Sequence, residues 1–434
     1  MRPANRASSP GRDGRSGGRG EPAAGAPGYE LRELGPTARA ILAAALRVLE
    51  RDGFAGLTLR RIAAEAGETK SLIIYHFGDK DGLLAALVDS LWHDEDMDLV
   101  RRLARLPDAP ADRLRALIDA HHALALETRE YRMYFDLLPR LLRHSGTRRR
   151  HAELNRTYRT LGATAMPGDE TSPGDRIALA SLLLAVDEGA AALLQLDRDG
   201  FDHERAFALL QELAAAHAGT ASVAKAGSPV VPGAVPADGG DPGALFNDPA
   251  ADLAPVARRL LEAALRVFAS RGLSAVTFDA IARASGEPSS ATTYYFGEKR
   301  NLIVAMNDTL LARAQRTALR YLRTPYRGDG HPLAALPLVD PGVLRSMRGL
   351  YEMFPEIVRD DELLDRHAAF VAWLRAAAGA ACRGSDAAWS PALVDLTLAV
   401  AYGLPIQLLI DRDALDPAPV LDAWRGLVAA FAAG

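Results

Sequence analysis

The sequence predicts an all-α protein built from two tandem helical units, and two observations carry this prediction. The stretch 58–80, TLRRIAAEAGETKSLIIYHFGDK, recurs with changes at 277–299 as TFDAIARASGEPSSATTYYFGEK. Apolar residues in both stretches, and in long segments beyond them, follow helical spacing. Gly272 follows Gly53 by 219 residues, far more than the roughly 20–50 residues of a solenoid repeat. A duplicated domain is therefore expected.

Each copy is expected to hold two short helices joined by a tight turn. In the first copy Thr58 suits a helix N-cap, and Gly67 ends the helix that follows, as a residue free to take positive φ does. A second helix then runs from Thr69 to about residue 76, with Ile73 and Phe77 facing inward. This arrangement is typical of a helix-turn-helix (HTH), whose second helix enters the major groove of DNA.

The second copy repeats this pattern with different residues. Gly286 takes the place of the turn glycine, and Phe296 takes the place of the inward aromatic anchor. Pro288 suits the first turn of the second helix, where a missing N–H costs nothing.

An ordered set of residues accompanies the HTH in both copies. In the first copy it comprises AALRV at 44–48, Gly53, Thr58, Ile62, Ala63, Ala66, Gly67, Tyr75, His76, Phe77, Lys80, Leu83 and Leu84. In the second copy it comprises AALRV at 263–267, Gly272, Thr277, Ile281, Ala282, Gly286, Tyr294, Tyr295, Phe296, Lys299 and Leu302. Together these residues resemble the N-terminal domain of TetR-family transcriptional regulators. The resemblance covers about residues 37–92 and 256–310 strongly and the following helical regions weakly.

The resemblance implies that both HTH units contact double-stranded DNA. Lys80 stands in the first turn of a helix, where N–H groups and a cation can share a phosphate. A solvated surface lysine is the alternative, but the recurrence as Lys299 favours the phosphate role. The implied contacts in the first unit are Thr58, Lys70, Ser71, Leu72, Ile74, Tyr75, His76 and Lys80. In the second unit they are Thr277, Ser289, Ser290, Ala291, Thr293, Tyr294, Tyr295 and Lys299.

Several residues depart from the family pattern. Glu68 and Glu287 follow the turn glycines, where the family usually has an apolar residue, and Ile74 and Thr293 replace a usual tyrosine. Thr292 replaces an inward aliphatic residue, so the second recognition helix is expected to be less well anchored. These departures favour an alternative, in which one or both HTH units have lost specific DNA binding.

The helical regions after each HTH correspond, by resemblance, to a ligand-binding and dimerisation core. The first region could line a pocket that is mostly apolar with a few polar contacts. Ordinary core aromatics and surface histidines are the alternative for each residue. The pocket residues considered are His121, His122, Tyr131, Tyr134 and Asp136, with His367 and Trp373 in the second half.

The last two helices of each unit are expected to form a four-helix interface between the two halves, again by resemblance. The apolar segment around Gly189 recurs around Gly403, so the duplication covers the whole unit. Small residues at these positions would permit close helix approach.

Composition excludes several other classes of protein. The net charge is −4, which argues against sequence-blind DNA binding through phosphate charge. Cys382 is the only cysteine, so no intrachain disulfide and no cysteine-based zinc site is expected. No Gly-rich phosphate loop, HExxH or GxSxG motif is present, and no uninterrupted apolar run approaches about 18 residues. We expect a cytoplasmic protein that is not an enzyme, has no cofactor or metal and does not contact a membrane.

The predicted domain order alternates HTH domains with helical cores. Residues 1–28 are expected to be a disordered Arg/Gly-rich tail, with a minor-groove arm as the alternative. The remaining divisions are 29–92 (first HTH domain), 93–218 (first core), 219–249 (flexible linker), 250–310 (second HTH domain) and 311–434 (second core).

The sequence therefore predicts a ligand-responsive transcriptional regulator, most simply a repressor, that acts as a single-chain pseudo-dimer. Because Lys70-Ser71-Leu72 and Ser289-Ser290-Ala291 differ, its operator should be asymmetric. The expected partners are double-stranded DNA, an unknown small-molecule effector and the other half of the same chain, with further homodimerisation possible. A sensing or interaction protein without specific DNA binding is the alternative.

Overall fold

The computed structural model describes most of the chain outside two long segments. The described residues are 34–103, 105–107, 109–126, 128–166, 172–217, 246, 248–322, 331–335, 337–384 and 387–433. The predicted tail at 1–28 and nearly all of the predicted linker at 219–249 lie outside these ranges.

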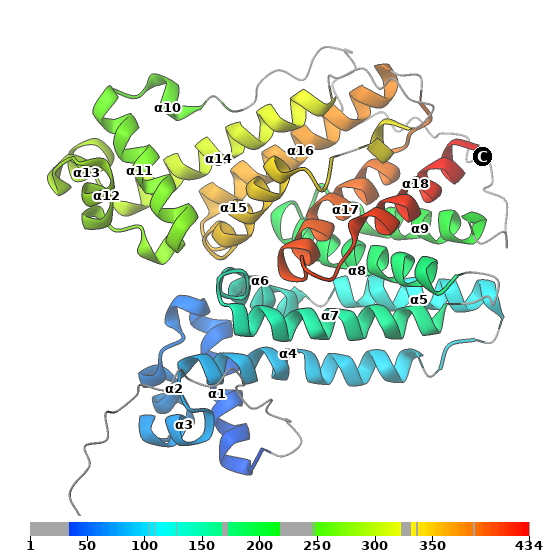
Figure 1. Ribbon diagram of the computed structural model, residues 1–434, viewed down its shortest axis with the longest axis horizontal. Coiled ribbons are helices and arrows are strands. Elements are labelled where there is room, and N and C mark those ends of the chain that lie inside the picture. Colours follow the sequence, from blue (N-terminus) through cyan, green and yellow to red (C-terminus); the bar gives the residue numbers. More distant parts are fainter. Residues whose placement is uncertain are drawn as a thin grey trace, which may run out of the picture.

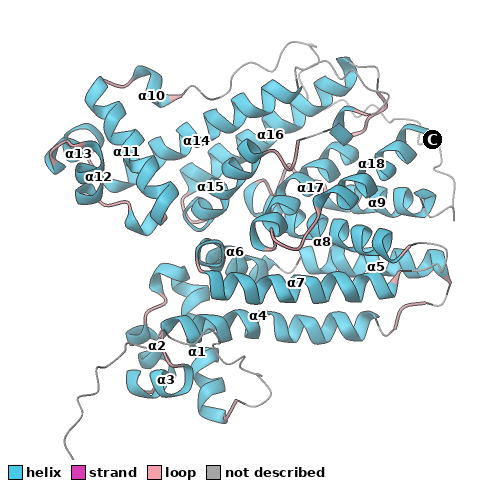
Figure 2. Cartoon of the chain, in the orientation of Figure 1, coloured by secondary structure: helices cyan, strands magenta, loops and turns pink. Residues whose placement is uncertain are grey.

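Every regular element among the described residues is a helix, which confirms the predicted all-α class (Figure 2). The first half contains α1 (Pro36–Gly56), α2 (Leu59–Ala66), α3 (Lys70–Phe77), α4 (Lys80–Leu103), α5 (Pro110–Ala125), α6 (Thr128–Arg143), α7 (Ser145–Ala165), α8 (Pro173–Leu196) and α9 (His203–His217). The second half contains α10 (Pro249–Asp252), α11 (Pro255–Arg271), η2 (Leu273–Ala275), α12 (Phe278–Ser285), α13 (Ser289–Phe296), α14 (Lys299–Leu322), η3 (Pro332–Ala335), α15 (Pro341–Ile357), α16 (Asp361–Gly384), α17 (Pro391–Ile410) and α18 (Pro417–Ala433).

The two halves share a helix order, apart from α5 of the first half and the short α10 and η2 of the second. Between α14 and α15 the described residues of the second half form only the short 3-10 helix η3, whereas the first half has the 16-residue helix α5 between α4 and α6. This difference falls between the end of α14 at Leu322 and the start of α15 at Pro341.

The first HTH domain (α1–α3) and the second HTH domain (α11–α13) lie at the same end of the molecule, on the left of Figure 1. Long helices extend from them toward the opposite end. Helices α8, α9, α17 and α18 occupy the middle of this view, with α4, α5 and α7 on one side of them and α14–α16 on the other. Contacts of α8 and α9 with α17 and α18 join the two halves.

Helices α8 and α17 touch through their backbones. A Cβ atom added at Gly189 would overlap the carbonyl oxygen of Ala399, and one added at Gly403 would overlap that of Ala185. No residue larger than glycine fits at either position without moving one helix. Gly189 and Gly403 are therefore required by the close approach of the two halves.

Helices α8 and α17 are also long and apolar enough to cross a membrane by length and composition. In each helix, however, 89% of the most apolar window is buried inside the molecule. Burial against the partner helices accounts for their apolar character, as expected for helices that are hydrophobic on all sides.

Substituting Gly189 with alanine should weaken the association of the halves. Since the new methyl group would overlap the Ala399 carbonyl, we expect the free energy of unfolding to fall by about 1–3 kcal/mol. Urea denaturation measures this change. Gly174→Ala near the start of α8 is the matched control, because the nearest atom, Ser172 Oγ, lies 3.7 Å away. Equal stability of the two variants would contradict the proposed packing.

Candidate nucleic-acid interface

The first HTH domain is formed by capped helices. The Thr58 hydroxyl accepts a hydrogen bond from the Arg61 N–H at 3.3 Å, and the Thr69 hydroxyl accepts one from the Leu72 N–H at 3.2 Å. Gly67 ends α2 with φ of 68°, a left-handed conformation that disfavours other residues. The caps thus fix where the two short helices begin, and their buried side chains pack them against α1 and α4.

Helix α3 has a buried side and an exposed side. Ile73 and Phe77 are buried, whereas Tyr75 is 80% exposed and Ile74 47% exposed. Of the remaining residues predicted to contact DNA in this helix, Lys70 and Ser71 are exposed, and Leu72 and His76 are half-buried. Large apolar and aromatic side chains on an open helix face suit contacts to thymine methyl groups and phosphates.

The second HTH domain repeats this geometry. The Thr277 hydroxyl accepts a hydrogen bond from the Ala280 N–H at 3.2 Å, and Gly286 has φ of 76°. Pro288 is the N-cap of α13, one position before the first turn in which it was expected. Ser289, Ser290, Thr293, Tyr294 and Tyr295 are exposed, and Ala291 is half-buried.

Thr292 weakens the packing of α13 against the rest of its domain. Its side chain is fully buried, and its hydroxyl has no hydrogen-bond partner among the described residues. An unsatisfied buried hydroxyl costs about 1–3 kcal/mol. The corresponding residue of α3 is the fully buried Ile73, so α13 is held less firmly than α3.

The glutamate after each turn glycine has a different environment in the two domains. Glu287 accepts hydrogen bonds from Arg259, with Nε–Oε1 at 2.9 Å. Pairing within the domain therefore neutralises this unusual acidic residue. In the first domain, Glu65 rather than Glu68 accepts from arginines, namely Arg47 at 2.8 Å and Arg51 at 3.0 Å.

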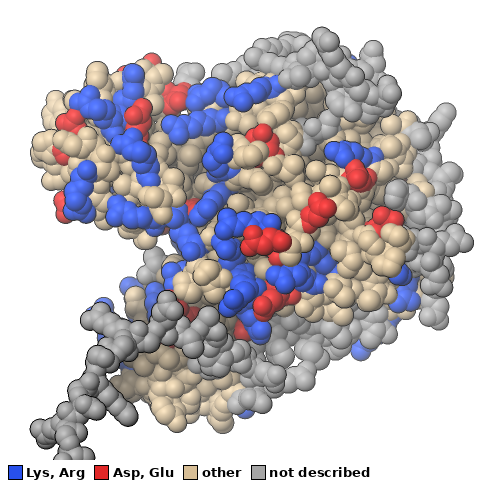
Figure 3. Space-filling view, viewed as in Figure 1, with Lys and Arg blue, Asp and Glu red and all other residues tan. Residues whose placement is uncertain are grey.

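Lys80 and Lys299 also differ. The Lys80 ammonium lies 5.2 Å from the centre of the Phe54 ring. Partial burial, and to a smaller extent repulsion from Arg140, lowers the pKa of Lys80. Lys299 is exposed. Figure 3 shows lysines and arginines spread over the second HTH domain, interspersed with acidic residues.

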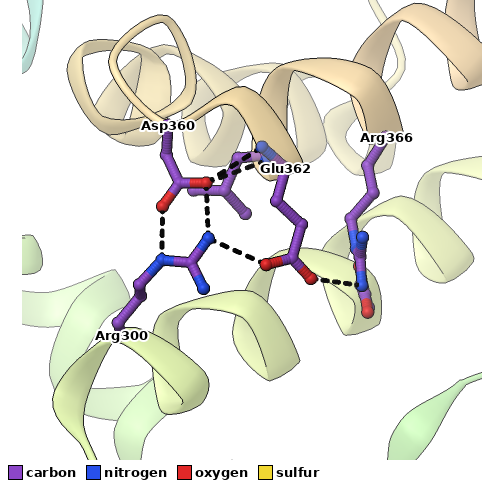
Figure 4. A network of polar contacts seen from close by, with 6 residues as sticks. Arg300, Asp360, Glu362 and Arg366 are labelled. Carbon is purple, nitrogen blue, oxygen red and sulfur yellow. Dashed lines mark hydrogen bonds and ion pairs between the residues drawn. The ribbon is translucent and has the colours of Figure 1, made fainter.

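Different ion pairs hold the long helix that follows each HTH domain against its core. Figure 4 shows Arg300, in the first turn of α14, reaching Asp360 and Glu362, with Arg366 beside Glu362. Arg300 Nε lies 2.7 Å from Asp360 Oδ2. In the first half the charges are reversed, because Asp81 in the first turn of α4 contacts Arg140.

The predicted pocket residues of the first half lie in two separate places. His121 Nδ1 lies 2.8 Å from Asp187 Oδ2, and the Tyr131 hydroxyl donates to the same carboxylate. Tyr134 is buried beside Tyr131. His122 Nε2 instead lies 2.9 Å from His203 Nδ1. Burial, and to a smaller extent repulsion from His203, lowers the pKa of His122.

The second half contains an apolar cavity of about 160 Å³ between α14, α15, α16 and α17, here called the second-half cavity. His367 lines it, whereas Trp373 stacks on Phe370 in the adjoining apolar cluster. His367 Nε2 lies 2.8 Å from Asn307 Oδ1, and burial lowers the His367 pKa to about 3. The imidazole is therefore neutral near pH 7.

Two crossed ion pairs join α6 to α15 and to the turn after it, and sequence reasoning missed them. Arg143 pairs with Glu352 and donates to the Phe268 carbonyl of the second HTH domain at 2.8 Å. Arg359 pairs with Asp136 of the first half. A Cβ atom at Gly53 would lie 2.6 Å from an Arg359 nitrogen. Each arginine thus contacts the HTH domain of the opposite half.

A signal for these pairs was present in the sequence. Both the arginines and their carboxylates recur at a spacing of 216 residues, from Arg143 to Arg359 and from Asp136 to Glu352. The spacing could have shown that the residues correspond, but not that each arginine crosses to the other half.

The fold and this surface define a helical protein with two HTH domains. Residues 41–87 and 260–306 match the family model for bacterial regulatory proteins of the tetR family. Both HTH domains therefore match this family, and the chain carries two tandem TetR-like units.

Curated relatives match one part of the chain. The chain is 37% identical over 81 residues to the HTH-type transcriptional regulator BetI of Burkholderia mallei, which is 19% of this chain and 42% of that protein. It is 34% identical over 83 residues to BetI 1 of Chromohalobacter salexigens, which is 19% of this chain and 41% of that protein. The chain thus spans about two fifths of the length of these relatives.

A solved structure of a transcriptional regulator from Rhodococcus sp. Rha1 is 24% identical. The match covers 36% of this chain and 82% of the Rhodococcus protein, with a TM-score of 0.32.

The buried His367 should make stability depend on pH. Its pKa is about 3 in the folded state and about 6.5 in the unfolded state, so the unfolded state binds more protons between these values. The free energy of unfolding should therefore fall as the pH falls below 6.5. Between pH 6.5 and 5, the His367→Gln variant should lose about 1.5 kcal/mol less free energy of unfolding than the unsubstituted chain. Urea denaturation at both pH values measures this difference. An unchanged pH dependence would contradict a neutral buried imidazole.

Proposed function

We propose that the protein is a sequence-specific, DNA-binding transcriptional regulator that acts as a single-chain pseudo-dimer. The observation that carries this proposal is the pair of exposed helices α3 and α13, held by two tetR-family domains at the same end of the molecule (Figure 1). TetR-like relatives named as transcriptional regulators support it.

The pseudo-dimer is supported by reciprocal contacts between the halves. Arg156 of the first half lies 3.2 Å from Asp411 of the second, and Arg375 of the second half lies 3.0 Å from Asp197 of the first. Asp197 and Asp411 occupy corresponding positions, since Gly189 and Gly403 precede each by eight residues. Covalent linkage of two such halves gives an effective concentration of order mM, so one chain can supply both HTH domains.

An asymmetric operator follows from the different exposed residues. Helix α3 presents Lys70, Ile74 and Tyr75, whereas α13 presents Ser289, Thr293 and Tyr294 at the corresponding positions. A long cation and an apolar side chain in one helix, against two hydroxyl groups in the other, should prefer different base pairs. The expected phosphate contacts are Thr58, Tyr75, His76 and Lys80, with Thr277, Tyr294, Tyr295 and Lys299 in the second domain.

Regulation by a small molecule, with repression as the outcome, is the second part of the proposal. The second-half cavity offers a site among the helices that follow the second HTH domain. A ligand that binds one spacing of the HTH domains better than another shifts the population of that spacing. Such a regulator works in the cytoplasm, where its DNA lies, and performs no catalysis.

A second function is favoured by the buried hydroxyl of Thr292. In this alternative, the weaker packing of α13 has removed its specific DNA binding. The chain is then a sensing or interaction protein with at most one active HTH domain. Selection of binding sites from random duplex DNA, followed by footprinting, separates the two functions. A bipartite, non-palindromic site supports the pseudo-dimer, whereas failure to enrich any sequence would overturn the proposed function.

The mass of the complex tests the pseudo-dimer directly. We expect light scattering to give the mass of one chain in solution and one chain per operator. Two chains per operator would mean that the halves of one chain do not supply both DNA contacts.

Lys80→Ala should weaken binding to all DNA sequences by a similar factor, because a phosphate contact carries no sequence information. The slope of log K against log salt concentration should become shallower by about one unit. Fluorescence anisotropy over a salt series measures both effects. Lys299→Ala is the matched variant in the second domain. Arg425→Ala is the control, because Arg425 is an exposed residue of α18 outside both HTH domains. A change of sequence preference in Lys80→Ala would contradict the phosphate role.

A further inference from the structure

Helix α15 lines the second-half cavity and also leads to a contact with the first HTH domain. Its residues Met347, Leu350, Met353 and Ile357 face the cavity. Two residues beyond its end, Arg359 pairs with the buried Asp136 and lies against Gly53. A displacement of α15 by a cavity occupant would therefore reach the opposite half of the chain.

The corresponding place in the first half is filled. Tyr131 corresponds to Met347 at the spacing of 216 residues, and Asp187 corresponds to Ala401 at the spacing of 214 that also relates Gly189 to Gly403. The Tyr131 hydroxyl donates to Asp187 in the first half, whereas Met347 and Ala401 line the cavity in the second. Replacement of a hydrogen-bonded pair by two apolar side chains leaves room for another molecule.

We infer that the second-half cavity binds one small, uncharged, largely apolar molecule with a single hydrogen-bond donor, and that its occupancy is communicated through α15 and Arg359 to the first HTH domain. This inference rests on the proposed ligand-responsive function and deepens it, because it specifies the ligand chemistry, a single site and a route across the halves.

The residues around the cavity determine the ligand chemistry. The described residues that line it include no Asp, Glu, Lys or Arg, so an ionised ligand would lose its hydration without gaining a partner. The Asn307 side-chain oxygen can only accept, so His367 Nε2 carries the proton and Nδ1 is an acceptor. Nδ1 is buried and has no partner among the described residues. A ligand hydroxyl would satisfy it.

The volume limits the ligand to about one ring. A cavity of about 150 Å³ lined by apolar side chains can hold benzene, and the second-half cavity measures about 160 Å³. A phenol combines this size with the required donor.

Partial burial favours the route through Arg359. Asp136 is 2% exposed and the Arg359 side chain 30% exposed, so the Arg359–Asp136 pair is partly shielded from solvent. Phe354 of α15 also stacks on Phe135 of α6 with ring centres 4.3 Å apart. Arg300, which joins the same turn to α14, is instead 51% exposed, and exposed ion pairs contribute little. A shift of α15 is therefore transmitted across the halves by close packing and a half-buried ion pair.

Titration calorimetry of the full chain with phenol, toluene and benzoate tests the ligand chemistry. We expect one phenol per chain, weaker binding of toluene by about five- to tenfold through loss of one buried hydrogen bond, and no binding of benzoate. His367→Leu should remove the preference for phenol over toluene, and Met347→Tyr/Ala401→Asp should abolish binding. No heat with phenol at millimolar concentration, or equal binding of benzoate, would overturn the assignment.

Hydrogen exchange with and without phenol tests the route. Amide exchange in α1–α3 should change by at least about twofold on binding, and Asp136→Asn/Arg359→Gln, which removes both charges together, should abolish that change. Arg143→Gln/Glu352→Gln, the corresponding pair on the other side, should leave it intact. The route would be refuted if phenol did not change amide exchange in α1–α3 of the unsubstituted chain. It would also be refuted if the change persisted in Asp136→Asn/Arg359→Gln.

Neither measurement needs DNA, so the two proposals fail separately. A normal phenol response without DNA binding would overturn the proposed function alone. Specific DNA binding without a phenol response would overturn this inference alone.

Discussion

The direct backbone contact between α8 and α17 is the constraint on which the arrangement of the chain depends. Gly189 and Gly403 let two apolar helices from different halves approach until carbonyl oxygens occupy the space of absent side chains. The buried faces of α8 and α17 are thereby covered, and α9 and α18 complete the interface. Because both HTH domains are attached to this joint core through long helices, its geometry determines how far apart they lie.

Duplication produced a frame that is symmetric in its contacts and unequal in its chemistry. Arg143 and Arg359 make matching contacts across the halves, each at the HTH domain of the other. Around this frame, single substitutions have changed the local chemistry: Asp81 corresponds to Arg300, and Asp187 corresponds to Ala401. A frame of this kind allows one half to hold a ligand while the other stays filled, because the contacts that join the halves do not involve the substituted residues.

The two HTH domains share a backbone but differ in how firmly the second helix is held. A fully buried isoleucine anchors α3, whereas α13 buries a threonine whose hydroxyl lacks a described partner. The glutamate that departs from the family pattern in the second domain is neutralised by Arg259. The departures visible in the sequence are thus of two kinds, one compensated by a neighbour and one that carries an energetic cost.

The sequence by itself determined the local structure: the all-α class, the two HTH units and the residues at their turns, because helical spacing, N-caps and left-handed glycines are properties of neighbouring residues. It also identified Gly189 and Gly403 as positions of close approach. Tertiary structure alone decided that Arg359 pairs with Asp136. It also decided that Met347 and Ala401 face a cavity, whereas Tyr131 and Asp187 fill the corresponding place in the first half. These residues are distant in sequence, and their meeting depends on how whole helices pack across two halves, which no local pattern specifies.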